Sequence, residues 1–74
     1  MSNVAKLRRF KGMTQTDIAV MLDISLQAYF RKEKGYVNFT DKEKIFLKEF
    51  FSEEFPNITI DTIFFSQEVP KVEN

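Results

Sequence analysis

The chain has 74 residues, of which 43 % are hydrophobic and nine are phenylalanine, and it contains neither cysteine nor histidine. A chain of this length forms one small domain that buries roughly 60–65 % of its unfolded surface, with no disulfide or thiolate zinc site to reinforce it. No apolar run approaches the ~18 residues of a membrane span and no signal-peptide core is present, so we expect a cytoplasmic protein without a membrane partner.

The basic and acidic residues cancel in number but are unevenly distributed. Residues 1–36 contain seven basic and three acidic residues, a net charge of +4, whereas residues 37–74 contain four and eight, a net charge of −4. Such asymmetry between halves is typical of a domain with one nucleic-acid-binding face. Two ordinarily solvated surfaces would give the same count, and that alternative stays open.

The N-terminal part of the sequence predicts one short helix. Asn3 is a plausible N-cap, and the helix is expected from about Val4 to Lys11, with Val4 and Leu7 facing inward. It should end at Gly12, because a helix commonly terminates at a residue in the left-handed conformation that glycine adopts without strain.

Residues 14–35 predict two further helices joined by a tight turn. The first is expected at about Gln15–Leu22, where Thr14 followed three residues later by an aspartate is a capping signature. The second is expected at about Leu26–Lys34, with Ser25 as its N-cap and Gly35 after its end. Two short capped helices separated by about three residues are what a helix-turn-helix requires.

The C-terminal half predicts a long helix and one shorter element. Thr40 and Glu43 form a second capping box before a helix at about Asp41–Glu54, which is apolar around more than half its girth. Pro56 and Asn57 should break the helical structure after this helix. Residues 60–64 can form a last helix capped by Thr59, although the alternation over 58–65 also fits a strand. Residues 66–74 form a polar tail that we expect to be extended or frayed.

Catalysis is poorly supported by the composition. Without histidine or cysteine the chain lacks the usual bases, thiol nucleophiles and soft metal ligands, and two glycines cannot build a glycine-rich phosphate loop. We therefore expect no enzyme activity, no metal, no cofactor and no small-molecule substrate.

The motifs of the central region resemble a known family. Thr14-Gln15, Asp17-Ile18-Ala19, Leu22, Ile24-Ser25 and Glu33-x-Gly35, preceded by Leu7-Arg8 and Lys11-Gly12, occur in the order found in helix-turn-helix domains of the Cro and phage-repressor type. The resemblance covers about residues 3–65. It implies an all-α, compact five-helix lambda-repressor-like domain over residues 1–65, followed by the tail at 66–74. It also implies a transcriptional regulator of phage or prophage type that binds double-stranded DNA.

The resemblance also assigns roles to individual residues. Base-edge contacts fall to Leu26, Gln27 and Arg31 on the second helix of the motif. The Gln27 amide can pair with adenine, and Arg31 can contact a guanine or a phosphate. Phosphate contacts fall to Thr14, Gln15, Lys32, Lys34 and Tyr36. Arg8 and Glu33 match positions that form a structural ion pair between the first helix and the recognition helix.

Two residues depart from the family pattern. Asp23 replaces the glycine usual in the turn, although aspartate tolerates the left-handed region better than most residues. Lys32 stands where a buried aliphatic residue is usual. Either its ammonium group extends to the surface from a buried stem, or Phe30 turns inward and takes over the packing.

The aromatic residues of the C-terminal half predict a partner. They exceed what so small a core needs, and we expect a two-fold homodimer with an interface that includes Phe46, Phe50, Phe51, Phe64 and Phe65. An alternative function uses the same fold: a modulator or anti-repressor that binds another regulatory protein through this phenylalanine-rich, acidic half.

Overall fold

The computed structural model describes residues 2–65, and over this range it contains five helices and no strand. They are α1 (Val4–Phe10), α2 (Gln15–Leu22), α3 (Leu26–Glu33), α4 (Asp41–Phe51) and α5 (Ile60–Phe64). The prediction of an all-α domain with five helices is confirmed, and the open alternative for residues 58–65 is decided in favour of a helix. The predicted tail at 66–74 lies outside the described residues. None of the helices within 2–65 has both the length and the apolar character needed to cross a membrane.

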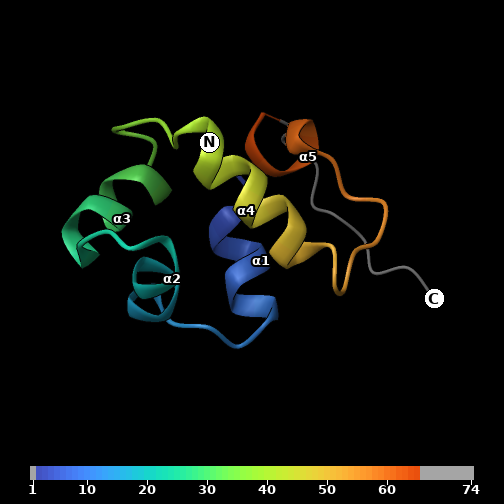
Figure 1. Ribbon diagram of the computed structural model, residues 1–74, viewed down its shortest axis with the longest axis horizontal. Coiled ribbons are helices and arrows are strands. Elements are labelled where there is room, and N and C mark those ends of the chain that lie inside the picture. The colour runs from blue at the N-terminus through green and yellow to red at the C-terminus, as the bar shows by residue number, and fades with distance from the viewer. Residues whose placement is uncertain (1, 66–74) are drawn as a thin grey trace.

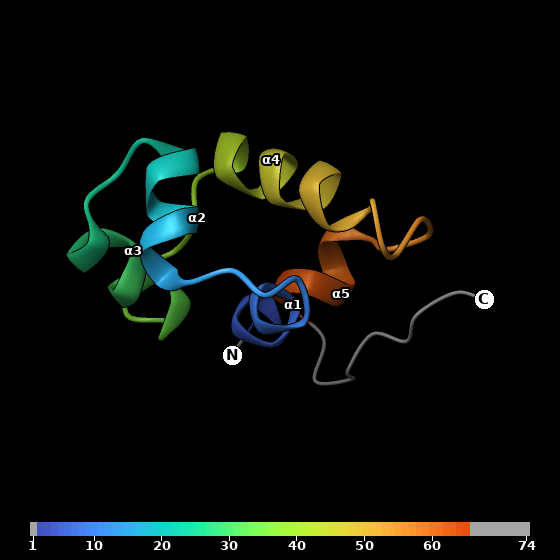
Figure 2. The ribbon, with the colours of Figure 1, turned by 90° about the horizontal axis from the view of Figure 1, so that it is seen from below.

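The helices enclose one core. Seen from below, α4 lies on one side of the molecule, α1 and α5 lie on the other, and α2 and α3 form one end (Figures 1 and 2). Helix α2 packs on α3, and α4 packs on α5. The buried apolar side chains come from all five helices and from the connecting segments: Val4, Leu7, Ile18, Ala19, Tyr29, Phe39, Leu47, Phe51, Phe55, Ile58, Ile63 and Phe64.

The beginnings of four helices follow from their capping residues. The hydroxyl groups of Thr14, Ser25, Thr40 and Thr59 each accept a hydrogen bond from the backbone N–H three residues later. At α2 and α4 the third residue is acidic and its carboxylate accepts the N–H of the capping threonine, which completes two capping boxes. All of these caps were predicted from the sequence, because the signal depends on spacing within a single turn.

Asn3, the residue directly before α1, behaves differently from these four caps. Asn3 precedes α1 but makes no side-chain capping bond. Instead its side-chain amide donates to the Thr62 carbonyl at 2.8 Å, and its backbone N–H donates to the Ile63 carbonyl at 2.7 Å. Asn3 thus occupies the predicted N-cap position, but its side chain fastens the start of the chain to α5 and does not cap α1.

The ends of the first three helices share one geometry. A residue with positive φ follows each helix: Gly12 at 73°, Asp23 at 58° and Gly35 at 86°. The N–H of that residue returns to the carbonyl three residues earlier, and the next N–H returns to the carbonyl five residues before it. This double closure is the Schellman arrangement. At Asp23 it reverses the chain within the three residues between α2 and α3.

Helix α4 ends at Phe51, three residues before the predicted end at Glu54. The Ser52 hydroxyl donates to the carbonyl of Glu49 at 2.6 Å, and such local bonds compete with helix continuation. Phe55 precedes a proline, which disfavours helical geometry at that position. The chain instead turns and buries the Phe55 ring.

The left-handed conformation of Asp23 makes its replacement a test of the turn. Asp23→Gly removes the strain of a side chain at positive φ and a negative charge at the carboxyl end of α2, so we expect the free energy of unfolding to rise by up to about 1 kcal/mol. Asp23→Val should lower it by about 1–2 kcal/mol. Urea unfolding measures both. Asp23→Asn removes only the charge and separates the two effects; an Asp23→Val variant as stable as the parent would contradict this account.

Candidate nucleic-acid interface

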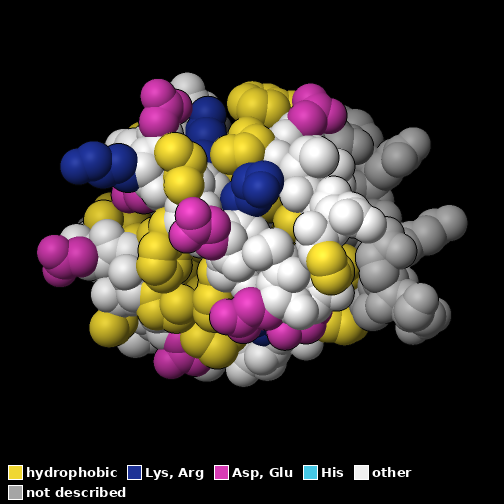
Figure 3. Space-filling view, turned by 45° about the vertical axis from the view of Figure 1, so that its right-hand side comes forward, with side chains coloured by type: hydrophobic (Ala, Val, Ile, Leu, Met, Phe, Trp, Pro, Cys, Tyr) yellow, Lys and Arg dark blue, Asp and Glu magenta, His cyan; other side chains and the backbone are white. Residues whose placement is uncertain are grey.

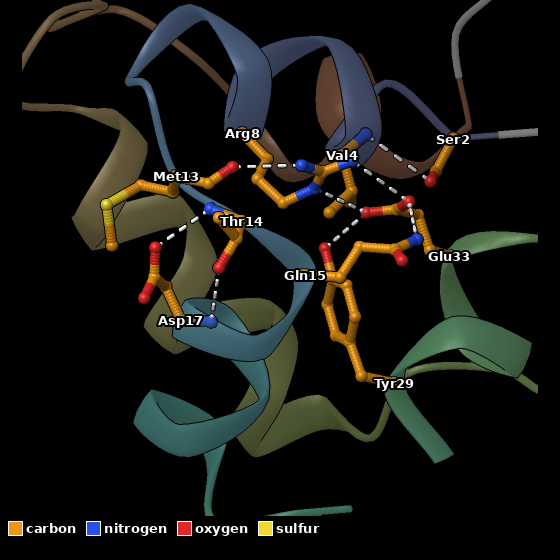
Figure 4. Close-up of polar contacts among 9 residues, drawn as sticks. All are labelled: Ser2, Val4, Arg8, Met13, Thr14, Gln15, Asp17, Tyr29 and Glu33. Atoms are coloured by element: carbon orange, nitrogen blue, oxygen red, sulfur yellow. Dashed lines mark hydrogen bonds and ion pairs between the residues drawn. The ribbon is translucent and has the colours of Figure 1, made fainter. Parts of the chain in front are cut away.

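The carboxylate of Glu33, at the end of α3, joins three helices. It accepts hydrogen bonds from Arg8 Nε at 2.9 Å and from the Tyr29 hydroxyl at 2.5 Å. It also accepts one from the Gln15 side-chain amide at 2.9 Å (Figure 4). The Arg8 guanidinium reaches further and donates to the Met13 carbonyl at 2.9 Å. Because the side chains of Arg8 and Glu33 are only 10 % and 5 % exposed, the predicted ion pair is confirmed as a buried one.

Within this cluster, Arg8 and Glu33 each stabilise the charged form of the other. Burial alone would raise the pKa of Glu33, but hydrogen bonds from Arg8, Tyr29 and Gln15 outweigh it and lower that pKa below its ordinary value. For Arg8 burial acts to lower the pKa, yet the bond to Glu33 and its charge raise it overall. Burial and the adjacent carboxylate both raise the pKa of Tyr29. The cluster is therefore an ionised pair with a neutral phenol attached.

Lys32 faces α4 and is not a free surface cation. Its ammonium group lies 2.6 Å from Glu43 Oε1, and its side chain is only 12 % exposed. The same Glu43 oxygen accepts the Thr40 N–H of the capping box. The structure thus contradicts the predicted phosphate contact of Lys32, whose charge is already neutralised within the chain. The stem of Lys32 is buried, as the first alternative has it, but its ammonium group pairs with Glu43 instead of extending to the surface. The second alternative is wrong, because Phe30 remains 40 % exposed.

The opposite face of α3 is open to solvent. Gln27 and Arg31 are exposed one helical turn apart, and within residues 2–65 neither side chain makes a hydrogen bond or ion pair. Leu26 is 48 % exposed beside them, and Phe30 lies on the same face. Lys34 is exposed at the end of the helix, and Tyr36 is exposed after it. The structure therefore brings all three predicted base-contact residues to one solvent-facing surface.

The start of α2 offers less than the sequence suggested. The Thr14 hydroxyl accepts the Asp17 N–H, and the Thr14 N–H donates to the Asp17 carboxylate at 2.8 Å. The Gln15 amide is engaged by Glu33. The phosphate contacts assigned to Thr14 and Gln15 stay predictions, and in this structure both side chains already have partners within the chain.

Two cations that the sequence did not single out lie near Lys34. Lys6 and Arg9 of α1, together with Lys34, line a cleft of about 310 Å³ between α1 and the end of α3. Glu33 also borders this cleft, but Arg8 neutralises it. The cleft therefore carries an excess of positive charge. Only the fold shows this, because α1 and α3 are far apart in the sequence.

The aromatic residues predicted for a dimer interface divide into two groups. Phe51 and Phe64 are buried in the core of a single chain, so their assignment to an interface is wrong. Phe46 and Phe65 are exposed. Phe50 is half-buried, and the Lys11 ammonium group lies 4.0 Å from the centre of its ring. The core of a single chain therefore buries more phenylalanine side chains than we expected from the composition.

Comparison with known proteins adds no assignment. No protein-family model, curated protein or solved structure matches the chain. A functional proposal therefore depends on the residues and their geometry.

The Glu33 cluster predicts a large effect of one substitution. Glu33→Ala leaves the Arg8 guanidinium, the Tyr29 hydroxyl and the Gln15 amide without their shared acceptor, and we expect a loss of roughly 3–5 kcal/mol in the free energy of unfolding. Glu53→Ala removes a carboxylate that pairs with Lys11 at the surface, and it should cost less than about 1 kcal/mol. Chemical denaturation measures both, and equal costs would contradict the buried network.

Stability should also depend on pH through Glu33 and Glu43, whose pKa values are both lowered in the folded chain. For Glu43 burial opposes the shift, while the bonds from Lys32 and Thr40 cause it. The unfolded chain binds the proton more readily, so this stabilisation is fully present above the ordinary glutamate pKa of about 4.3 and is lost as the pH falls through the lower folded values. Thermal unfolding from pH 7 to pH 2 should show the loss, and Glu33→Gln should reduce its amplitude.

Proposed function

We propose that this chain binds double-stranded DNA as a sequence-specific transcriptional regulator, with α3 as the helix that enters the major groove. The observation that carries the proposal is the exposed pair of Gln27 and Arg31 on α3, with no partner in the described part of the chain. Glutamine and arginine are the residue types that read adenine and guanine through paired hydrogen bonds. The lambda-repressor-like arrangement suggested by the sequence motifs belongs to this proposal.

The distribution of charge on α3 supports it. Of the charged side chains of this helix, Glu33 is neutralised by Arg8 and Lys32 by Glu43. Arg31 remains on the helix, and Lys34 follows directly after it, both exposed. The open face of the helix is therefore positive although the whole chain is neutral. Lys34 and the cleft cations Lys6 and Arg9 are suited to phosphates, which position a protein on the duplex without specifying a sequence.

The way α3 is held in the fold also suits a helix that contacts bases. The buried ring of Tyr29 and the ion pairs of Lys32 and Glu33 hold one side of it against the rest of the molecule. The other side presents side chains from a fixed backbone. Base recognition requires such preorganisation, because a bidentate contact depends on both position and orientation.

A second candidate function is a protein-interaction module on the same fold. It is favoured by Leu26 and Phe30, two large apolar side chains that are about half exposed on the same face of α3. Leu26 can offer DNA only apolar contact, such as with a thymine methyl group. A protein partner would bury both residues.

A binding titration over a salt series separates the two candidates. With a random duplex library, a DNA-binding protein should lose affinity as salt rises, with a log–log slope of about 0.9 per neutralised phosphate. A protein-interaction module should show little affinity for duplex at any salt concentration, and that result would overturn the proposal.

Replacing Gln27 and replacing Arg31 should change DNA binding in different ways. Gln27→Ala removes no charge, so we expect a loss of about 1–3 kcal/mol on the preferred site, weaker discrimination at one base pair and an unchanged salt slope. Arg31→Ala should either lose discrimination at a second base pair or weaken binding to all sequences and reduce the salt slope by about 1. Fluorescence anisotropy with matched and mismatched duplexes measures these effects.

A charge control lies on a different helix. Lys48→Ala on α4 removes a cation without touching α3, and it should leave both affinity and salt slope close to those of the parent. If Gln27→Ala binds every duplex as the parent does, α3 is not the reading helix.

A further inference from the structure

Helix α4 exposes an apolar centre between two opposite charges. Ile45 is 53 % exposed and Phe46 is 38 % exposed, and they occupy the middle of the helix. Lys42 and Glu49 are exposed on the same side, one before and one after this pair. These positions recur at the three- and four-residue spacing that places side chains in one stripe on a helix.

The surface next to this stripe is also apolar. A hollow of about 200 Å³ between α2 and α4 is lined by Met21, Leu22 and Phe46, together with Lys42 and Glu43. Figure 3, in which the face formed by α2 and α4 lies toward the left, shows hydrophobic side chains gathered there with charged side chains around them. Exposed apolar side chains grouped in this way are a candidate interaction surface.

The order of the charges distinguishes two ways of pairing α4 with itself. In an antiparallel pair with its two-fold axis between Ile45 and Phe46, Lys42 faces Glu49 of the partner subunit, and Glu49 faces the partner's Lys42. Ile45 then meets Phe46 of the partner subunit at the axis. In a parallel pair the two lysines face each other and so do the two glutamates, which is unfavourable.

We propose that the α4 stripe of Lys42, Ile45, Phe46 and Glu49 binds a second copy of this chain in an antiparallel, two-fold arrangement. The surface is complementary to itself, as a two-fold interface requires. The hollow beside Phe46 provides space for an apolar side chain of the partner. This interface replaces the broader set of aromatic residues expected from the sequence, and of that set it retains only Phe46 at its centre.

Sedimentation equilibrium of the whole protein without DNA tests the interface. The parent protein should form dimers, and Ile45→Asp should be monomeric with an unchanged far-UV circular dichroism spectrum. Val37→Asp, which alters a comparably exposed residue in the loop before α4, is the matched control and should remain dimeric. A parent protein that stays monomeric up to about 1 mM overturns the proposal.

A charge exchange tests the antiparallel order without changing the apolar centre. Lys42→Glu and Glu49→Lys each set like charges against each other twice, and each should weaken the dimer by roughly ten-fold or more. The double variant restores opposite charges and should return the dissociation constant toward that of the parent. If the double variant is as weak as the two single variants, the proposed pairing is wrong.

Single cysteines define the register, since the natural chain has none to interfere. A mixture of Lys42→Cys and Glu49→Cys proteins should cross-link through a short bismaleimide, whereas each protein alone should not. Cross-linking within each single preparation, but not between the two, indicates a parallel pair and overturns the proposal. The inference does not depend on DNA binding: a monomer that binds duplex contradicts only the dimer, and a dimer without affinity for duplex contradicts only the proposed function.

Discussion

The carboxylate of Glu33 is the point on which the arrangement of α1, α2 and α3 depends. It lies at the end of α3 and receives donors from Arg8 on α1, Gln15 on α2 and Tyr29 on its own helix. A buried charge is costly unless it is paired and fully hydrogen-bonded. Here the cost is offset only while all three helices keep their relative positions. The cluster therefore specifies the arrangement of the helices as well as contributing to stability.

A second buried ion pair also holds α3 in place. Lys32 of α3 pairs with Glu43 of α4, and the same carboxylate takes part in the capping box of α4. The end of α1 is in turn connected to the end of α4, because the Lys11 ammonium group contacts the Phe50 carbonyl and the carboxylates of Glu53 and Glu54. In this small domain without disulfides, polar links between helices supplement a limited core.

The sequence was informative wherever a feature depends on neighbouring residues. Both capping boxes and the first residue of each helix follow from spacing over three to five residues, and the structure contains them. The left-handed position at Asp23 was expected from the family pattern. The Arg8–Glu33 pair joins distant residues, and it was predicted only through the resemblance to a family. Sequence alone did not place Tyr29 and Gln15 in the same cluster, although Tyr29 lies one turn before Glu33.

The sequence was less informative where packing decides. Phe51 and Phe46 look alike in a helical stripe, yet one is fully buried and the other is exposed. Lysine is usually a surface residue, but Lys32 is largely buried because its ammonium group pairs with the carboxylate of Glu43, eleven positions later. These outcomes depend on where α4 and α5 lie relative to α3, which local periodicity does not contain. The positive cleft between α1 and α3 has the same origin.

The division of α3 into a fastened side and an open side has an evolutionary consequence. The buried Tyr29 and the ion-paired Lys32 and Glu33 hold the helix, whereas the exposed Leu26, Gln27 and Arg31 contribute little to holding it. Substitutions at the second set are therefore nearly neutral for folding, and they can accumulate while the first set remains constrained. Under the proposed function, a lineage of such chains can diversify what the open side recognises while inheriting the same scaffold, because the tolerant residues are the ones proposed to contact DNA.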